Sequence, residues 1–287
     1  MRATEFEFHA PSTLGGALEV LDKYEEEAKV LAGGMSMLPA MNLGLLRPAA
    51  IVSLNHMSGL DGVGEENGTI HIGAMARHAE LASNELLRTL VPLVSSAAAV
   101  IGDVQIRNRG TIGGSIAHAD PAGDYLAPTI ALAAEVTLTS SEGSRTVPAR
   151  EFFVDIMRTN AAPTEIVTGI SIPKPPDGTR MGYARLVRVE GNFAIVTAAA
   201  VVSDELATVA LGGVANRPAL VEQPAAPLRD GGDAAFEALA DAVERACEET
   251  YGDLTGTAEY RREMAKVYAR RAVRAALDND AREGRNQ

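Results

Sequence analysis

Two short segments of this chain each place a pair of glycines beside hydroxyl-bearing residues. The first is Ala32-Gly33-Gly34-Met35-Ser36-Met37, and the second is Thr111-Ile112-Gly113-Gly114-Ser115-Ile116. Glycine tolerates positive φ and lets the backbone come close to a ligand, so each segment can aim several N–H groups at one anion. Two such segments, with serine and threonine as further donors, predict a long ligand whose two phosphates are bound from both sides. The alternative is a pair of unrelated tight turns.

Composition narrows the possible functions. The 287 residues, 46% of them hydrophobic, suffice for two or three modules with buried cores. A net charge of −12 leaves no broad basic surface, so we expect no nucleic-acid partner. No apolar run is long enough to span a bilayer, and residues 1–7 lack the apolar core of a secretion signal. We therefore expect a cytoplasmic protein without a transmembrane segment.

The single cysteine limits the metal chemistry open to this chain. One thiol builds neither a disulfide framework nor a cluster that needs four thiolates. Cys247 ends a helix-like stretch, in which a buried structural thiol is expected. The five histidines show no HExxH pattern or comparable ligand spacing. Any redox chemistry of this chain must therefore be carried by an organic cofactor.

The apolar pattern divides the chain into three units. In residues 1–56, a helix over 14–21 precedes a strand at 29–32 that ends at the first glycine segment, with 50–54 as its parallel partner. In residues 57–173 we expect strands at 69–74, 135–139, 145–147 and 165–172. The proline-rich segment 173–178 is the predicted linker. In residues 178–287 we expect strands at 183–187, 194–202 and 208–211, then helices at 234–250 and 259–277.

Two common nucleotide-binding motifs are absent from the sequence. Neither a GxxxxGK[ST] sequence nor a GxGxxG after a strand occurs, which argues against a P-loop NTPase and an ordinary Rossmann dehydrogenase. The glycine segments contain no lysine, so backbone amides and hydroxyls would have to bind the phosphates. Such donors orient a bound cofactor, but they do not supply the cationic groups that phosphoryl transfer needs.

Taken together, these motifs resemble those of the FAD-binding medium subunits of molybdenum hydroxylases, the family of carbon monoxide dehydrogenase and xanthine dehydrogenase. The resemblance rests on the two glycine segments and on Asp124, and it extends over nearly the whole chain. Further matching positions are Phe6-x-Phe8-x-x-Pro11, Arg47-Pro48, Gln105-Ile106-Arg107, Asp120-Pro121 and Glu259-Tyr260-Arg261-Arg262.

The resemblance implies an α+β fold of the p-cresol methylhydroxylase and vanillyl-alcohol oxidase (PCMH/VAO) type. Two α/β subdomains, 1–56 and 57–173, would bind FAD, and a C-terminal domain, 178–287, would hold a three-stranded antiparallel sheet and helices. Two runs of residues would wrap the FAD pyrophosphate: Ala32, Gly33, Gly34, Met35, Ser36 and Met37, and Thr111, Ile112, Gly113, Gly114 and Ser115.

Three further positions are implied as FAD contacts, and each has an alternative. Asp124 would accept a hydrogen bond from FAD, or else it is a surface or capping aspartate. Phe193 would cover the flavin ring, or else it is a core phenylalanine at the start of a strand. Arg185 would stabilise negative charge on reduced flavin, whereas residue type alone favours a solvated strand arginine.

The resemblance also implies an oxidoreductase function shared with partner chains. A large subunit would hold the molybdenum cofactor and a small one the [2Fe-2S] clusters, in an (αβγ)2 assembly. Electrons would reach FAD on this chain and leave to an external acceptor, and neither the substrate nor the acceptor is fixed by this sequence. Two alternatives remain open: a non-catalytic scaffold or sensor, consistent with Met35 where relatives often carry glutamine or histidine, and a self-contained flavin oxidase.

Overall fold

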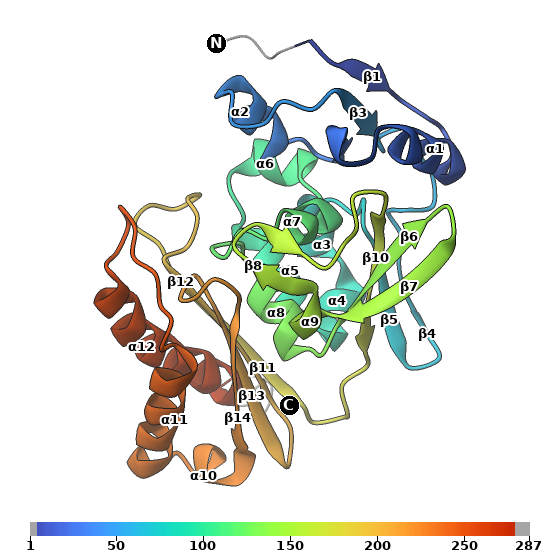
Figure 1. Cartoon of the computed structure of the whole chain (residues 1–287). Coiled ribbons are helices and arrows are strands. Elements are labelled where there is room, and N and C mark those ends of the chain that lie inside the picture. Colours follow the sequence, from blue (N-terminus) through green and yellow to red (C-terminus); the bar gives the residue numbers. More distant parts are fainter. Residues whose placement is uncertain (1–4, 279–287) are drawn as a thin grey trace.

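Three β-sheets of three or more strands follow one another along the described part of the chain, each with helices packed on it (Figure 1). The structure is a computed structural model, and it describes residues 5–278. Residues 279–287, at the end of the predicted C-terminal domain, lie outside the described part, as do residues 1–4. No helix within residues 5–278 combines the length and the apolar character that crossing a membrane requires.

The N-terminal sheet is parallel and has three strands, in the order β1-β3-β2. Its elements are β1 (Glu7–His9), α1 (Leu14–Tyr24), η1 (Glu25–Glu27), β2 (Ala28–Leu31), α2 (Met37–Asn42) and β3 (Ala50–Ser53). Thr13 is the N-cap residue of helix α1, and its hydroxyl accepts the Gly16 N–H at 3.2 Å. The helix buries Ala17, Leu18 and Leu21. The predicted parallel pairing of residues 29–32 with 50–54 is confirmed, so β2 delivers the first glycine segment at its carboxyl end.

The second unit is an antiparallel sheet of five strands, in the order β4-β5-β10-β6-β7. Its strands are β4 (Val63–Glu66), β5 (Thr69–Gly73), β6 (Glu135–Ser140), β7 (Gly143–Pro148) and β10 (Ile166–Pro173), beside a small hairpin of β8 (Phe153–Asp155) and β9 (Arg158–Thr159). Its helices are α3 (His78–Ser83), α4 (Glu85–Leu90), α5 (Pro92–Val100), α6 (Val104–Arg109), α7 (Ile112–His118), α8 (Leu126–Ala131) and α9 (Ala149–Phe152). All four strands predicted in this region are confirmed.

The C-terminal sheet has four antiparallel strands, so the expected number of three is wrong. Its elements are β11 (Arg180–Leu186), β12 (Val196–Val202), β13 (Leu206–Gly212), β14 (Ala219–Pro224), α10 (Ala225–Arg229), α11 (Asp233–Ala246) and α12 (Ala258–Asp278). The missed strand β14 lies at the edge and is bounded by Pro218 and Pro224, so its sequence has the character of a turn. Cys247, which follows α11, is fully buried as expected.

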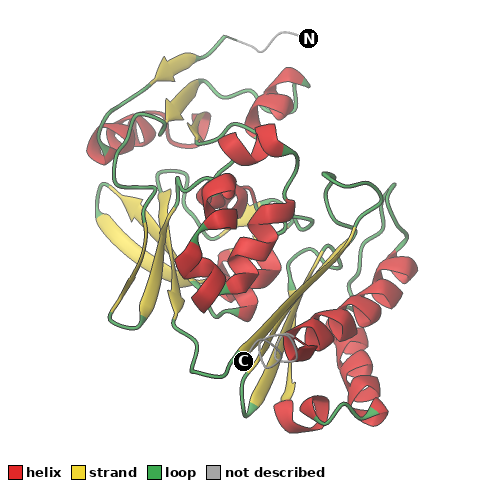
Figure 2. Ribbon diagram, turned by 180° about the vertical axis from the view of Figure 1, so that it is seen from behind, coloured by secondary structure: helices red, strands yellow, loops and turns green. Residues whose placement is uncertain are grey.

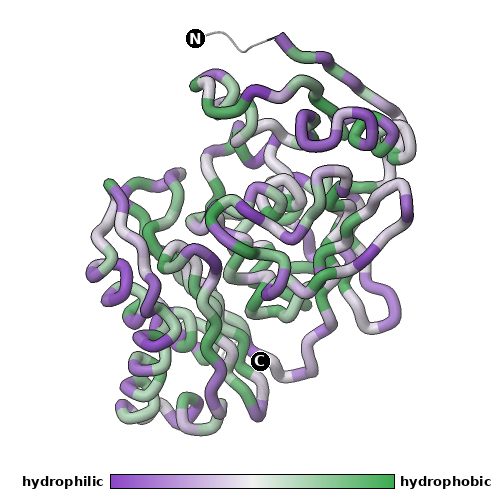
Figure 3. Tube along the Cα trace, in the orientation of Figure 1, coloured by the Kyte–Doolittle hydropathy of each residue, from purple (hydrophilic) through white to green (hydrophobic). Residues whose placement is uncertain are grey.

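Helices cover both faces of the C-terminal sheet, and those on one face belong to the second unit. Helices of the second unit lie between the two sheets (Figure 2), and α8 packs on β12 and β13. On β12, Ala198 and Ala200 belong to the apolar core that also contains residues of α11 and α12, whereas Ala199 joins the core of the second unit. A strand buried on both faces is hydrophobic without alternation, as in β12, where every residue but Val201 is buried and the trace lacks the purple of hydrophilic residues (Figure 3).

Candidate functional site

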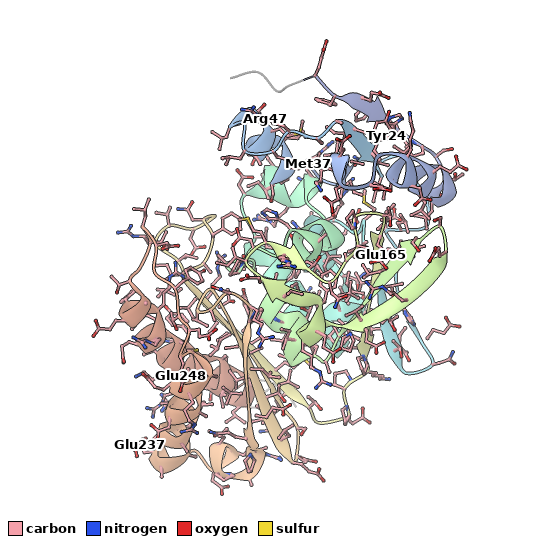
Figure 4. All side chains as sticks on the ribbon, in the orientation of Figure 1. Tyr24, Met37, Arg47, Glu165, Glu237 and Glu248 are labelled. Carbon is pink, nitrogen blue, oxygen red and sulfur yellow. The ribbon has the colours of Figure 1, made fainter. Side chains whose placement is uncertain are left out.

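The two glycine segments line one pocket, which lies between the N-terminal unit and the second unit. It has a volume of about 470 Å³ and is bounded by residues 28–37 on one side and by parts of 110–118 and 159–167 on the other. Figure 4 shows one lining residue on each side, Met37 on the N-terminal unit and Glu165 on the second unit. The sequence prediction that both segments face one ligand site is therefore compatible with the fold.

The first glycine segment follows β2 and meets the second unit directly. A Cβ atom on Gly33 would overlap the carbonyl oxygen of Arg109 and lie 2.7 Å from Cα of Gly110. Gly34 has a φ of 77°, in the left-handed region that favours glycine. Among the described residues, none accepts a hydrogen bond from the N–H groups of residues 33–36. These amides are therefore free to bind an anion in the pocket.

The second glycine segment is the first turn of α7 rather than a loop. Thr111 is the N-cap residue of this helix, and a Cβ atom on Gly113 would overlap the side chain of Ala74. The N–H groups of residues 112–115 all have partners in the protein: Ile112 donates to Ala76 O (3.1 Å), Gly113 to Ala74 O (2.9 Å), Gly114 to Thr111 Oγ1 (3.1 Å) and Ser115 to Thr111 O (3.1 Å).

The second segment therefore presents hydroxyl groups to the pocket. The expectation that free amides of both segments converge on one anion is wrong for residues 112–115, whose amides already donate inside the protein. Thr111 and Ser115 both line the pocket. Ile112 lies behind them, fully buried in the core of the second unit, and is not part of the lining. A ligand would thus meet amides on one side and hydroxyls on the other.

Asp124, Arg185 and Phe193 lie outside this lining, where the second unit meets the C-terminal sheet. Asp124 is 7% exposed and accepts a hydrogen bond from the Tyr183 hydroxyl at 2.7 Å, while Arg185 Nε lies 3.4 Å from its Oδ1. The alternative of a surface aspartate is therefore wrong. Burial raises the pKa of the Asp124 carboxyl, and the Arg185 cation and the Tyr183 hydroxyl act in the opposite direction.

The Arg185 guanidinium holds the loop that carries Phe193. Its Nη1 donates to the Val100 carbonyl at 2.5 Å and its Nη2 to the Asn192 carbonyl at 2.7 Å, and its side chain is only 9% exposed. The solvated strand arginine favoured by residue type is therefore wrong. Phe193 is 60% exposed in the loop between β11 and β12, so the alternative of a core phenylalanine is wrong as well.

Sequence reasoning missed two parts of the pocket wall. Residues 159–167 lead into β10 and line one end, and His78, at the start of α3, lies beneath the second segment. His78 is buried, its Nδ1 lies 3.1 Å from the Tyr125 hydroxyl, and its backbone N–H donates to Gly110 O at 3.1 Å. No local sequence pattern marks these residues, because only the tertiary structure brings them to the pocket.

The burial of His78 leads us to predict that the stability of the protein depends on pH. Burial, with Arg77 and Arg107 nearby, lowers the pKa of His78 to about 4. The unfolded chain, with a histidine pKa of about 6.5, takes up a proton between these values, so stability falls as the pH drops. We expect this uptake to lower the free energy of unfolding of the wild type by on the order of 2 kcal/mol between pH 7 and pH 5.

Urea unfolding at pH 7 and at pH 5 measures this loss. The midpoints at the two pH values should differ less for His78→Gln than for the wild type. His56→Gln changes an exposed histidine and should behave as the wild type. Parallel profiles for wild type and His78→Gln would contradict the assignment.

Comparison with known proteins agrees with this architecture. Residues 4–175 match the family of FAD binding domains in molybdopterin dehydrogenase, and residues 182–276 match the CO dehydrogenase flavoprotein C-terminal domain. The carbon monoxide dehydrogenase medium chain of Hydrogenophaga pseudoflava is 37% identical, over 94% of this chain and 96% of that one.

Two solved structures have the same fold. Reconstituted CO dehydrogenase from Oligotropha carboxidovorans superposes with a TM-score of 0.90 at 34% identity, over 96% of this chain and 99% of that one. Quinoline 2-oxidoreductase from Pseudomonas putida 86 gives 0.86 at 28% identity, over 97% and 99%. The chain belongs to the family of FAD-binding medium subunits of molybdenum hydroxylases, and it is an oxidoreductase subunit that serves electron transfer.

Proposed function

We propose that the pocket between the glycine segments holds the pyrophosphate of FAD. The observation that carries this proposal is the set of N–H groups at residues 33–36 that have no acceptor within residues 5–278 and that line the same pocket as Thr111 and Ser115. Two phosphates need several donors on both sides, and these residues supply them without a lysine. Met35 contributes its backbone N–H, since its side chain offers no donor.

We propose that the other three predicted contact residues lie at the flavin end of the cofactor. They are Asp124, Arg185 and Phe193. FAD supplies the redox chemistry when bound, and this chain binds and orients it. Asp124 has its Oδ1 engaged by Tyr183 and Arg185, which leaves Oδ2 as the acceptor. The exposed ring of Phe193 would cover the flavin, and Arg185 would hold the loop that presents that ring. Ile112 and Gly113 would act by shaping the backbone.

We further propose how this chain is organised and where it works. Its functional units are residues 1–56, 57–173 and 178–287, and the first two together enclose FAD. A large molybdenum-cofactor subunit and a small [2Fe-2S] subunit would join it in an (αβγ)2 assembly in the cytoplasm. Residues 5–278 gather no group of three or more potential metal ligands, which supports placing the metal centres on partner chains.

Titration of the full chain with FAD tests the proposed site. We expect one FAD per chain, and we expect ADP to compete because it carries the same pyrophosphate. Ser115→Ala removes one hydroxyl donor and should weaken FAD binding by about 3- to 10-fold. Ser58→Ala, at an exposed position outside the pocket, is the matched control. A colourless chain that takes up no added FAD would favour the scaffold alternative, and FAD binding without ADP competition would place the pyrophosphate elsewhere.

A further inference from the structure

We infer that the side chains of Asn55 and Arg77 form a bridge that fixes the two glycine segments relative to each other. The bridge joins the carbonyl of Ala32, in the first segment, to the carbonyl of Arg109, just before the second. Both residues are therefore positioning residues for the cofactor pyrophosphate. This inference rests on the proposed placement of FAD between the segments.

Three hydrogen bonds make up the bridge. Asn55 Nδ2 donates to the Ala32 carbonyl at 2.9 Å, and Arg77 Nη2 donates to Asn55 Oδ1 at 3.0 Å. Arg77 Nη1 completes the bridge by donating to the Arg109 carbonyl. The backbone of Arg77 is itself fixed, because its N–H donates to the Glu80 carboxylate at 3.1 Å in a capping box.

The bridge determines which way one free amide points. In a trans peptide the C=O and the following N–H point in opposite directions, so holding the Ala32 carbonyl orients the N–H of Gly33 away from Asn55. That N–H is one of the amides that find no acceptor in the described part of the chain. Without Asn55, the Ala32–Gly33 peptide loses the hydrogen bond that opposes its rotation, and the amide is no longer held ready for an anion.

Arg77 needs its fork geometry for this role, and not only its charge. The guanidinium donates in two directions at once, to a side-chain oxygen and to a main-chain oxygen. A lysine ammonium keeps the positive charge near the pocket, but a single nitrogen does not span both acceptors in the same way. The Arg77→Lys variant therefore separates a bridge from a simple electrostatic attraction to phosphate.

Titration of the full chain with FAD and with ADP, beside the melting temperature of each variant, tests the bridge. We expect Asn55→Ala and Arg77→Met each to weaken FAD and ADP by about 10-fold and by equal factors. The double variant should be little weaker than either single one, because each removes the same bridge. Arg77→Lys should stay weakened. Arg88→Met, an exposed arginine of α4, should bind as wild type.

Other outcomes overturn the inference in distinct ways. If Arg77→Lys recovers wild-type affinity, or if the two single effects add fully, the residues do not form a functional bridge. Melting temperatures that fall while FAD affinity stays within about twofold would make Asn55 and Arg77 purely structural. Asn55 is exposed, so Asn55→Ala folds even if Arg77→Met does not. A wild-type chain that binds neither FAD nor ADP would instead overturn the proposed function, and this inference with it.

Discussion

Replacing Gly33 by alanine is expected to weaken FAD binding by up to about 100-fold. The added Cβ would overlap the Arg109 carbonyl oxygen and lie 2.7 Å from Gly110 Cα. Both obstacles are backbone atoms, so neither is relieved by turning a side chain, and the two segments must move apart. Overpacking of this kind costs about 1–3 kcal/mol, and the upper part of that range corresponds to about 100-fold in a dissociation constant. Quenching of flavin fluorescence during titration measures the change.

The matched control is Gly15→Ala in α1. A Cβ at Gly15 meets nothing within 4 Å, and alanine is the better helix former, so this variant should fold and bind FAD as wild type. The melting temperature of Gly33→Ala without FAD distinguishes a widened pocket from a damaged fold. An alanine variant at position 33 with wild-type FAD affinity would show that the contact between the segments does not shape the site.

Local pattern was enough to place most of the secondary structure. Residues 29–32 form a short apolar run followed by glycines, and the expected strand is β2, paired in parallel with β3 as predicted. The sequence pattern did not indicate the edge strand β14. Its prolines and its half-exposed side chains weaken the alternation of apolar and polar residues that is typical of a strand. Sequence pattern thus identifies strands where burial is strong, and it fails where the sheet ends.

The chemistry of the second glycine segment depends on tertiary contacts that a sequence does not display. Its pattern predicts an anion-binding loop, but Ala74 and Ala76 approach from another part of the chain and accept the N–H groups of Gly113 and Ile112. The role of Arg185 also depends on tertiary contacts. By sequence alone, its strand resembles one that faces solvent. Packing of α5 against β11 places the Val100 carbonyl beside it. The sequence thus indicates which residues are candidates for the site. The role of each residue depends on the neighbours that the fold brings to it.

Arg261 is a buried charge in the C-terminal domain that holds the loop proposed to cover the flavin. The side chain is 1% exposed, and its Nη1 donates to the carbonyls of Ile195 and Gly213, each at 2.6 Å. Its Nη2 lies 2.7 Å from Asp253 Oδ2. Ile195 is two residues after Phe193, so Arg261 fixes the end of the loop whose other side is held by Arg185. The sequence marked this arginine only through the family resemblance.

Arg261→Met is expected to destabilise the chain by about 3–5 kcal/mol, because it leaves the two buried carbonyls of Ile195 and Gly213 without this donor. At about 2–4 °C per kcal/mol for a chain of this size, the melting temperature followed by circular dichroism should fall by roughly 10 °C. Arg271→Met removes an exposed arginine of the same helix whose guanidinium lies 4.6 Å from the Tyr268 ring centroid, a contact worth about 0.5–1 kcal/mol. If both variants melt within about 2 °C of each other, the Arg261 hydrogen bonds do not hold the domain, and the loop with Phe193 must be fixed from the Arg185 side alone.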